Sequence, residues 1–168
     1  MNEELDQFVR KVQDFPVEGI IFHDIAPLLR GHFDACIQAL EAQLEAREWA
    51  EIDAVVGVES RGFILAAALA QRQRKGFIPV RKAGKLPPPV VSCKYELEYG
   101  SGTLEMHTGT GRVLVVDDVL ATGGTLCGAA DLACDAGYQV AQLLVLINLG
   151  RVPEFRWRGI RPRAVILH

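Results

Sequence analysis

The sequence predicts an α/β fold with a mostly parallel central sheet flanked by helices, plus an antiparallel flap hairpin. Three short, mostly apolar runs, 52–58, 113–116 and 140–147, have the composition of strands that are covered on both faces. Segments of helical composition follow the first two runs, and strands that alternate with helices form parallel sheets. The chain has 168 residues, of which 49% are hydrophobic, so it is large enough for a full core. We therefore expect a single domain over 1–168.

The first third of the chain is predicted to be largely helical. Apolar residues at positions 5, 8, 9 and 12 have the spacing of one helix face, and Asn2 is a suitable N-cap. The tripeptide 14–16 would end this helix. Because Pro27 interrupts the segment 19–30, we expect that segment to lie against the core without a long helix. A second helix is predicted over 33–49.

The rest of the chain is predicted to alternate between strands and helices, with one hairpin. Apolar and polar residues alternate over 90–99, and a glycine turn and a return over 103–107 follow, which predicts a half-exposed hairpin. Its length and polar face suggest a flap, spanning about 88–108, that closes over a site. The other predicted elements are strands over 52–58, 76–80, 113–116, 140–147 and 164–167, helices over 63–72 and 126–136, and a basic loop over 81–85.

The charge distribution points to a small anionic ligand. The net charge of −3 argues against non-specific binding of nucleic acid. The window between Glu59 and Glu96 contains no acidic residue, whereas a solvated surface normally mixes both signs of charge. Its cations are Arg61, Arg72, Arg74, Lys75, Arg81, Lys82, Lys85 and Lys94. This block favours a polyanion such as a diphosphate, although the cations at 72–75, near a helix end, are better explained as ordinary exposed side chains.

Cysteine usage and hydropathy indicate the cytoplasm. The cysteines at 36, 93, 127 and 134 form no C-x-x-C pair and lie near no histidine cluster, so we expect free thiols and not metal ligands. The sequence contains neither a long apolar span nor a signal peptide. We therefore expect a cytoplasmic protein without a membrane partner.

The stretch 113–125, VLVVDDVLATGGT, predicts a site for a sugar phosphate. A strand, a glycine turn and a helix start let backbone N–H groups converge on a phosphate, and Thr122 and Thr125 can add hydroxyl donors. No lysine follows the glycines, so this is not a Walker A loop. Asp117 and Asp118 would repel a phosphate alone, but they suit the hydroxyls of a ribose 5-phosphate or a bound cation. Taken in isolation, an Asp-Asp pair after a strand is more often a turn or an N-cap, but the full thirteen-residue stretch favours a binding role.

This stretch resembles the signature that binds 5-phosphoribosyl 1-diphosphate (PRPP) in the type I phosphoribosyltransferases. Four further stretches resemble the adenine phosphoribosyltransferase family, in family order: GIIFHDIAPLL, VGVESRGF, PVRKAGKLP and YELEYGSGTLEMH. Together these stretches cover most of 19–125. The resemblance implies a purine-salvage enzyme that makes AMP and diphosphate from adenine and PRPP with Mg²⁺, usually as a homodimer.

The resemblance also implies roles for particular residues. The 5′-phosphate would bind to Ala121, Thr122, Gly123, Gly124 and Thr125, and the ribose hydroxyls to Asp117 and Asp118. The diphosphate would bind to Ser60, Arg61, Arg81, Lys82 and Lys85, the last three in either the same or a partner subunit's site. Arg61 and Glu98 would be catalytic, with Glu98 serving purine N7 when the flap closes and Tyr99 beside it. Mg²⁺ would bind through PRPP, with Asp117 and Asp118 as candidate ligands. The bond between Glu59 and Ser60 is expected to be cis.

The predicted base site departs from the family pattern, because His23 stands where the family has arginine. By resemblance, adenine would bind mainly to main-chain groups around Ile21 and His23, with apolar cover from Val119. If the arginine side chain were needed, the identity of the base would change. Two alternatives therefore stay open: a phosphoribosyltransferase for a 6-oxopurine, and a regulator that binds PRPP as a signal.

Overall fold

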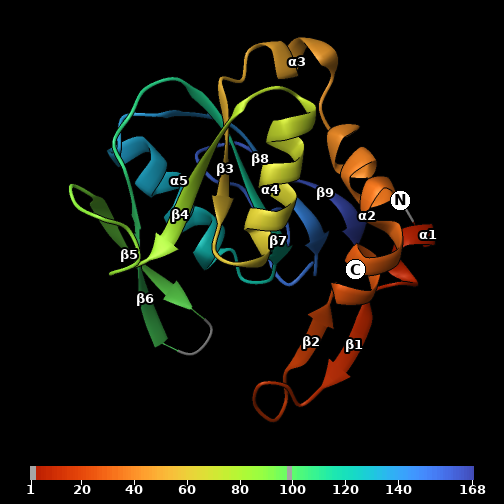
Figure 1. Cartoon of the computed structure of the whole chain (residues 1–168). Coiled ribbons are helices and arrows are strands. Elements are labelled where there is room, and N and C mark those ends of the chain that lie inside the picture. Colours follow the sequence, from red (N-terminus) through yellow and green to blue (C-terminus); the bar gives the residue numbers. More distant parts are fainter. Residues whose placement is uncertain (1–2, 98–99) are drawn as a thin grey trace.

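A seven-stranded sheet forms the centre of the molecule (Figure 1). The computed structural model describes residues 3–97 and 100–168. The strand order is β5-β6-β4-β3-β7-β8-β9. The bounds are β3 Ala54–Val58, β4 Gly76–Lys82, β5 Val91–Leu97, β6 Gly100–Met106, β7 Arg112–Leu120, β8 Gln139–Asn148 and β9 Arg163–Leu167. All neighbours from β4 to β9 pair in parallel, whereas β6 pairs antiparallel with β4 and β5, so the predicted fold class is confirmed.

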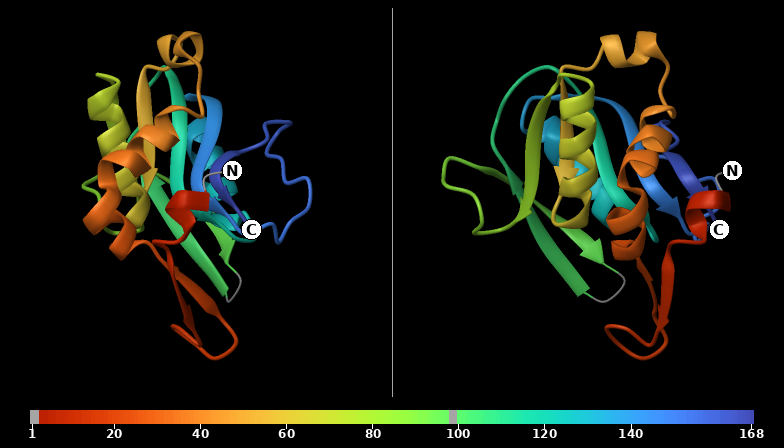
Figure 2. Two further views of the ribbon diagram at one scale, coloured as in Figure 1. Left: turned by 90° about the vertical axis from the view of Figure 1, so that its right-hand side faces the viewer. Right: turned by 45° about the vertical axis from the view of Figure 1, so that its right-hand side comes forward.

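Helices cover both faces of this sheet (Figure 2). α2 (Ala26–Glu41) and α4 (Arg61–Arg72) lie on one face, and α5 (Gly124–Asp135) lies on the other. The residues of β7 alternate between the two cores: Leu114 and Val116 face α2 and α4, while Val113 and Val115 face α5. All four are fully buried, which is why this segment is continuously apolar in the sequence.

The N-terminal segment differs from the prediction. α1 (Glu3–Asp6) is a single turn, and the chain then forms β1 (Arg10–Gln13), which pairs antiparallel with β2 (Ile21–Asp24). The predicted helix through residue 13 is therefore wrong. Leu5 and Val9 are buried as expected, but pairing with β2 decides the conformation of the residues that follow. We call β1 and β2 the N-terminal ribbon; it projects from the end of the molecule toward which β3 and β4 point (Figure 1).

The helix predicted over 33–49 differs from the structure in its limits, although its predicted start coincides with a kink in α2 (Ala26–Glu41) at His32. α2 begins at Ala26, with Pro27 in its first turn, where a missing N–H costs no intrahelical hydrogen bond. It ends at Glu41, and a separate short helix, α3 (Ala46–Ala50), begins after a capping box between Glu45 and Glu48. Proline thus starts the helix that the prediction took it to interrupt.

The predicted antiparallel hairpin is confirmed, but it is part of the main sheet, and residues 100–102, predicted as its turn, belong to β6. Arg81 and Lys82, predicted in a loop, extend β4, because they pair with Glu105 and Leu104 of β6. The apolar side of the hairpin packs on α5: a Cβ built on Gly128 would lie 2.6 Å from Cβ of Tyr95. The four cysteines are free thiols, as predicted. No helix within the described residues is long and apolar enough to cross a membrane.

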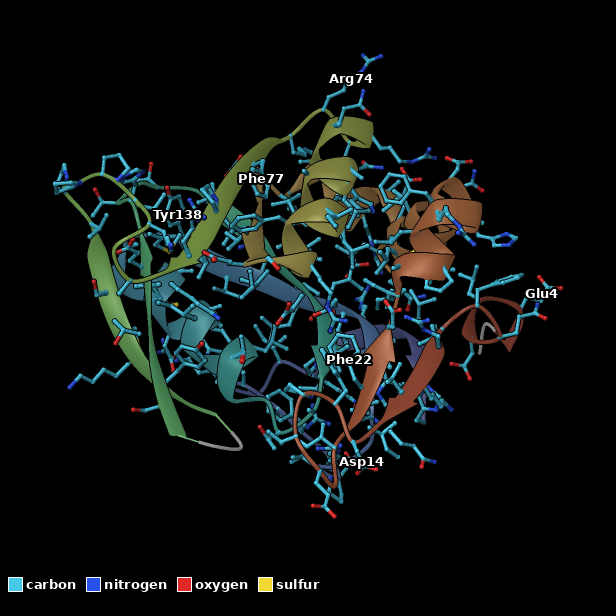
Figure 3. All side chains as sticks on the ribbon, turned by 60° about the horizontal axis from the view of Figure 1, so that its bottom comes forward. Glu4, Asp14, Phe22, Arg74, Phe77 and Tyr138 are labelled. Atoms are coloured by element: carbon cyan, nitrogen blue, oxygen red, sulfur yellow. The ribbon has the colours of Figure 1, made fainter. Side chains whose placement is uncertain are left out.

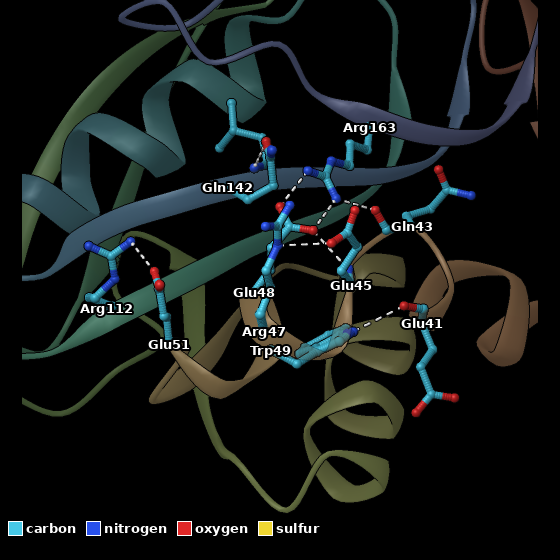
Figure 4. A network of polar contacts seen from close by, with 11 residues as sticks. Glu41, Gln43, Glu45, Arg47, Glu48, Trp49, Glu51, Arg112, Gln142 and Arg163 are labelled. Carbon is cyan, nitrogen blue, oxygen red and sulfur yellow. Dashed lines mark hydrogen bonds and ion pairs between the residues drawn. The ribbon is translucent and has the colours of Figure 1, made fainter.

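We expect Arg163→Lys to lower the free energy of unfolding by about 1 kcal/mol at pH 7. Arg163 on β9 forms a two-pronged ion pair with Glu48 of α3, with Nη1–Oε2 at 2.9 Å and Nη2–Oε1 at 2.5 Å, and also contacts the Gln43 carbonyl (Figure 4). Lysine cannot form both prongs. Urea titration should reveal the change. Arg156→Lys is the control, since its ion pair with Glu154 is long, at 3.9 Å, and should count for little.

The effect of Arg163→Lys should depend on pH. The hydrogen bonds from Arg163 are the main reason that the pKa of Glu48 falls from 4.5 to about 2. A carboxyl whose pKa is lower in the folded state stabilises the fold above its unfolded pKa and loses that contribution as the pH falls. The difference between wild type and variant should therefore shrink as the pH falls from 4.5 toward 2. An undiminished difference in acid would contradict the ion-pair explanation.

Candidate active site

The predicted site residues gather at one edge of the sheet. Because β3, β4 and β7 run in parallel, their carboxyl ends lie side by side: Val58 is opposite Val80, and Gly57 is opposite Val116. Three segments therefore meet at this edge: residues 59–61 after β3, the end of β4, and the acidic pair of β7. Open parallel sheets bind ligands at this edge.

The turn between β7 and α5 has the form of a phosphate cradle. β7 continues to Leu120, beyond the predicted end of the strand, and α5 begins at Gly124 after the turn over 121–123. Gly123 has φ +91°, and a Cβ there would lie 2.0 Å from the ring of Phe155. Both the backbone angle and the packing therefore require glycine. Thr122 is exposed, while Ala121, Gly124 and Thr125 are partly exposed at the start of the helix, where backbone N–H groups are free for an anion.

The two carboxylates of β7 are buried, with Asp117 6% and Asp118 7% exposed. Burial, and then the neighbouring charge of Asp118, raise the pKa of Asp117 well above its usual value. The backbone N–H of Asp118 donates to Asp117 Oδ1 at 2.9 Å. α4 comes so close that a Cβ on Gly62 would lie 3.0 Å from Asp117 Oδ1. Two acidic groups packed this tightly favour a partner that donates hydrogen bonds or carries positive charge.

Arg61 connects this pair to the N-terminal ribbon. Its Nη2 lies 2.5 Å from Asp118 Oδ2, and its Nη1 donates to the carbonyl of His23 at 2.9 Å. The guanidinium carbon lies 4.6 Å from the ring centroid of Phe22, which Figure 3 labels on β2. The peptide bond between Glu59 and Ser60, just before Arg61, is cis, as expected. Arg61 thus contacts both a predicted sugar-binding group and a predicted base-binding group.

The basic residues of β4 are held by an acid that the sequence did not single out. Glu59 Oε2 accepts hydrogen bonds from Arg81 Nε and from the backbone N–H of Lys82, both at 3.1 Å. Arg81 is therefore not a freely solvated cation. The side chains of Ser60, Lys82 and Lys85 are exposed. The only sequence signal for Glu59 was its position beside Ser60 at a strand end.

The predicted base region lies on the N-terminal ribbon and on β7. Ile21 is 45% exposed, and His23 and Val119 are partly buried. Burial is the main reason that the pKa of His23 is lowered, and His168, whose ring centroid lies 5.4 Å away, adds to the effect. The His23 imidazole is therefore neutral near pH 7. The predicted catalytic Glu98 and its neighbour Tyr99 lie outside the described residues.

The donor groups at this edge fit a magnesium ion that takes most of its ligands from a substrate and water. Within 3–97 and 100–168, no group of three or more His, Cys, Asp or Glu side chains could enclose a metal ion. Asp117 and Asp118 are the acidic side chains beside the phosphate cradle. Mg²⁺ commonly binds through one or two carboxylates plus substrate oxygens.

Comparison with known proteins places the chain in a family. Residues 30–158 match the model of the phosphoribosyl transferase domain. The chain is 50% identical to an adenine phosphoribosyltransferase of Hydrogenovibrio crunogenus over 96% of this chain and 95% of that one. The chain belongs to the adenine phosphoribosyltransferase family. A family member from Kosmotoga olearia is 43% identical, over 98% of this chain and 99% of its own length.

Solved structures of the family have the same fold. The adenine phosphoribosyltransferase of Thermoanaerobacter pseudethanolicus has a TM-score of 0.89 at 38% identity and matches over 99% of both chains. That of Saccharomyces cerevisiae, complexed with an imino-altritol bisphosphate and adenine, has a TM-score of 0.85 at 33% identity over 97% of both chains. The resemblance noted in the sequence is thus confirmed at the level of the family and its fold.

Proposed function

We propose that this chain transfers the 5-phosphoribosyl group from PRPP to adenine, giving AMP and diphosphate in purine salvage. The contacts of Arg61 with Asp118 and with the His23 carbonyl carry this proposal. They join the PRPP signature to the segment assigned to the base, so one small region can hold both substrates. The family membership of the chain and the adenine in the yeast relative's structure support adenine as the acceptor.

The reaction breaks the bond from ribose C1 to the diphosphate and forms a bond to purine N9. We infer that catalysis depends on placed charge, since a departing diphosphate and a cationic sugar must both be stabilised. Backbone N–H groups over 121–125 hold the 5′-phosphate, and Asp117 and Asp118 hold the ribose hydroxyls. Arg61 is released from Asp118 when PRPP binds, and it then neutralises the diphosphate together with Lys82 and Lys85.

Further parts of the proposal concern the metal and the state of the protein. Asp117 and Asp118 would hold Mg²⁺ together with PRPP, and the ion would supply positive charge at the diphosphate.

We also propose one catalytic domain over 1–168, a cytoplasmic location in keeping with its free thiols, and a homodimer. Two exposed apolar side chains, Ile64 at 44% and Phe77 at 39%, support a second copy as partner. They lie on neighbouring elements, α4 and β4; Phe77 is labelled in Figure 3.

A purine panel tests the proposed function. Adenine, hypoxanthine and guanine are each offered with PRPP and Mg²⁺, and the release of diphosphate is followed. We expect turnover with adenine. Turnover only with hypoxanthine or guanine would favour the 6-oxopurine alternative, and tight PRPP binding without turnover of any purine would favour the PRPP-sensing regulator.

Glu98→Gln is expected to slow the chemical step by about 10²-fold, the lower end of the usual range for general acid–base catalysis. Glutamine keeps the size and one hydrogen bond of the side chain but cannot exchange a proton with purine N7. Single-turnover rates should show the loss, while PRPP affinity stays near that of wild type. Glu96→Gln, two residues earlier in the sequence, is the control. A single-turnover rate within a factor of two of wild type would contradict the catalytic role of Glu98.

Ile64→Asp is expected to dissociate the proposed dimer. A buried, unpaired charge at the centre of an apolar interface is strongly unfavourable. Sedimentation velocity at micromolar concentration should show a dimer for wild type and a monomer for the variant. Val152→Asp, which introduces the same charge at another exposed apolar residue, should stay dimeric. A monomeric wild type would overturn this part of the proposal.

A further inference from the structure

Glu105 is a buried carboxylate away from the acidic pair of β7. It lies on β6, flanked by the fully buried Leu104 and Met106, and is itself 4% exposed. A buried carboxylate needs strong hydrogen-bond partners, because removal from water is costly. Among the described residues, Glu105 has three such partners, and all are backbone N–H groups of one short segment.

These three donors come from consecutive residues, 84–86, of the segment that follows β4. Gly84 N–H donates to Oε2 at 3.0 Å, and Lys85 and Leu86 donate to Oε1 at 2.7 and 2.6 Å. Successive N–H groups that converge on one anion form a compact anion-binding turn. Gly84 has φ +81°, a conformation that favours glycine, and a Cβ there would meet nothing within 4 Å. The requirement for glycine at this position is thus one of backbone angle alone.

Further contacts extend from this turn to the proposed diphosphate site. Arg81 Nη1 donates to the Lys85 carbonyl at 3.1 Å, while its Nε binds Glu59, two residues before Arg61. Directly after β6, His107 Nε2 lies within hydrogen-bond distance, 2.8 Å, of the Pro87 carbonyl. One set of hydrogen bonds therefore runs from Glu105 through the segment 84–86 and Arg81 to the end of β3.

We propose that Glu105 is a positioning residue for diphosphate binding. Its carboxylate fixes the backbone of 84–86. It thereby places Lys85 and, through the hydrogen bond from Arg81 Nη1 to the Lys85 carbonyl, the guanidinium of Arg81. This inference rests on the proposed function, since it concerns the diphosphate of PRPP. If Glu105 contributed only to stability, Glu105→Gln would lower the thermal stability of the protein but would not selectively weaken its affinity for diphosphate.

Glu105→Gln is the direct test. An amide presents N–H groups where the loop needs an acceptor, so the turn should loosen. We expect the KM for PRPP and the dissociation constant for diphosphate, measured by calorimetry with Mg²⁺, to rise by roughly ten- to hundredfold. The KM for adenine should stay within a factor of two. Glu51→Gln, at an exposed carboxylate that pairs with Arg112, is the matched control and should change neither constant.

Two further variants separate positioning from stability. Gly84→Ala leaves Glu105 intact but disfavours the backbone angle of the turn, so it should reproduce the selective loss of diphosphate affinity. Lys85→Met combined with Glu105→Gln should raise the PRPP KM by less than the product of the single effects, because both act through one loop.

The outcomes distinguish this inference from the proposed function. A wild type that makes no AMP from adenine would overturn the proposed function. If the wild type is active, and Glu105→Gln and Gly84→Ala both keep its affinity for PRPP and diphosphate, only the positioning role of Glu105 is overturned. If Glu105→Gln does not fold, Gly84→Ala decides the question by the same measurements.

Discussion

The double substitution Asp117→Asn, Asp118→Asn is expected to reduce kcat/KM for PRPP by roughly 10²–10⁴-fold while the protein stays folded. Each carboxylate is proposed to accept a hydrogen bond from a ribose hydroxyl, and a hydrogen bond to a charged group is worth about 1.5–3 kcal/mol. Calorimetric titration with PRPP and steady-state kinetics measure the loss. Asp135→Asn, at the exposed end of α5, is the control and should leave both values unchanged.

Substitution of Asp117 in this pair should lower activity but raise the stability of the fold. The pKa of Asp117 is raised mainly by burial, and then by the charge of Asp118. A group whose pKa is higher in the folded state stabilises the fold below its unfolded pKa and loses that contribution as the pH rises through its folded pKa. Asp117→Asn, which keeps the shape and the Oδ1 acceptor, should therefore unfold at a higher urea concentration than wild type at pH 8. A lower midpoint would contradict this stability prediction, whereas unchanged PRPP affinity in the double variant would contradict the sugar-binding assignment.

The strands and the core of the site were predictable because their signals are local. A strand buried on both faces needs a continuous apolar run, and 113–116 has one. The residues at the ends of parallel strands must meet at one edge, so strand order alone brought Arg61, Asp117 and Asp118 together. The glycine turn and the helix after it complete that edge without any long-range information.

The parts that were missed depend on contacts between distant segments. Residues 10–13 have a helical pattern, but hydrogen bonds to β2 place them in a strand. Glu59 and Glu105 resembled ordinary polar residues until the fold placed backbone N–H groups of β4 and its loop against them. Phe155, which packs on Gly123, lies in a loop whose sequence carries no sign of that contact.

The base preference has the largest expected effect: adenine should be favoured over hypoxanthine by about 10⁴–10⁵-fold in kcat/KM. Adenine presents an amino donor at position 6 and an acceptor at N1, whereas hypoxanthine presents an acceptor at position 6 and a donor at N1. A pocket with a main-chain carbonyl at position 6 and an N–H at N1 pairs with adenine. With hypoxanthine, the same groups would face like partners and stay unpaired in a buried site, which is costly.

The local structure around His23 is compatible with recognition by the main chain. The His23 carbonyl already accepts one hydrogen bond from Arg61, and a carbonyl oxygen has a second lone pair for a further donor. Burial and His168 lower the pKa of the His23 side chain, so it brings no positive charge to the base near pH 7. Its ring lies beside that of His168, whose Nε2 is 3.1 Å from Asp6 Oδ1. The His23 side chain therefore packs against other residues of this chain.

His23→Arg, which restores the family's residue, should therefore change adenine turnover by less than about tenfold and leave the preference for adenine intact. Adenine and hypoxanthine are mixed at equal concentration with PRPP and Mg²⁺, and the two nucleotide products are separated and counted for wild type and variant. His23→Gln, which keeps a neutral polar side chain, is the control. Efficient use of hypoxanthine by wild type would overturn the adenine assignment. A preference that appears only in His23→Arg would show that the side chain at this position, and not the main chain, selects the base.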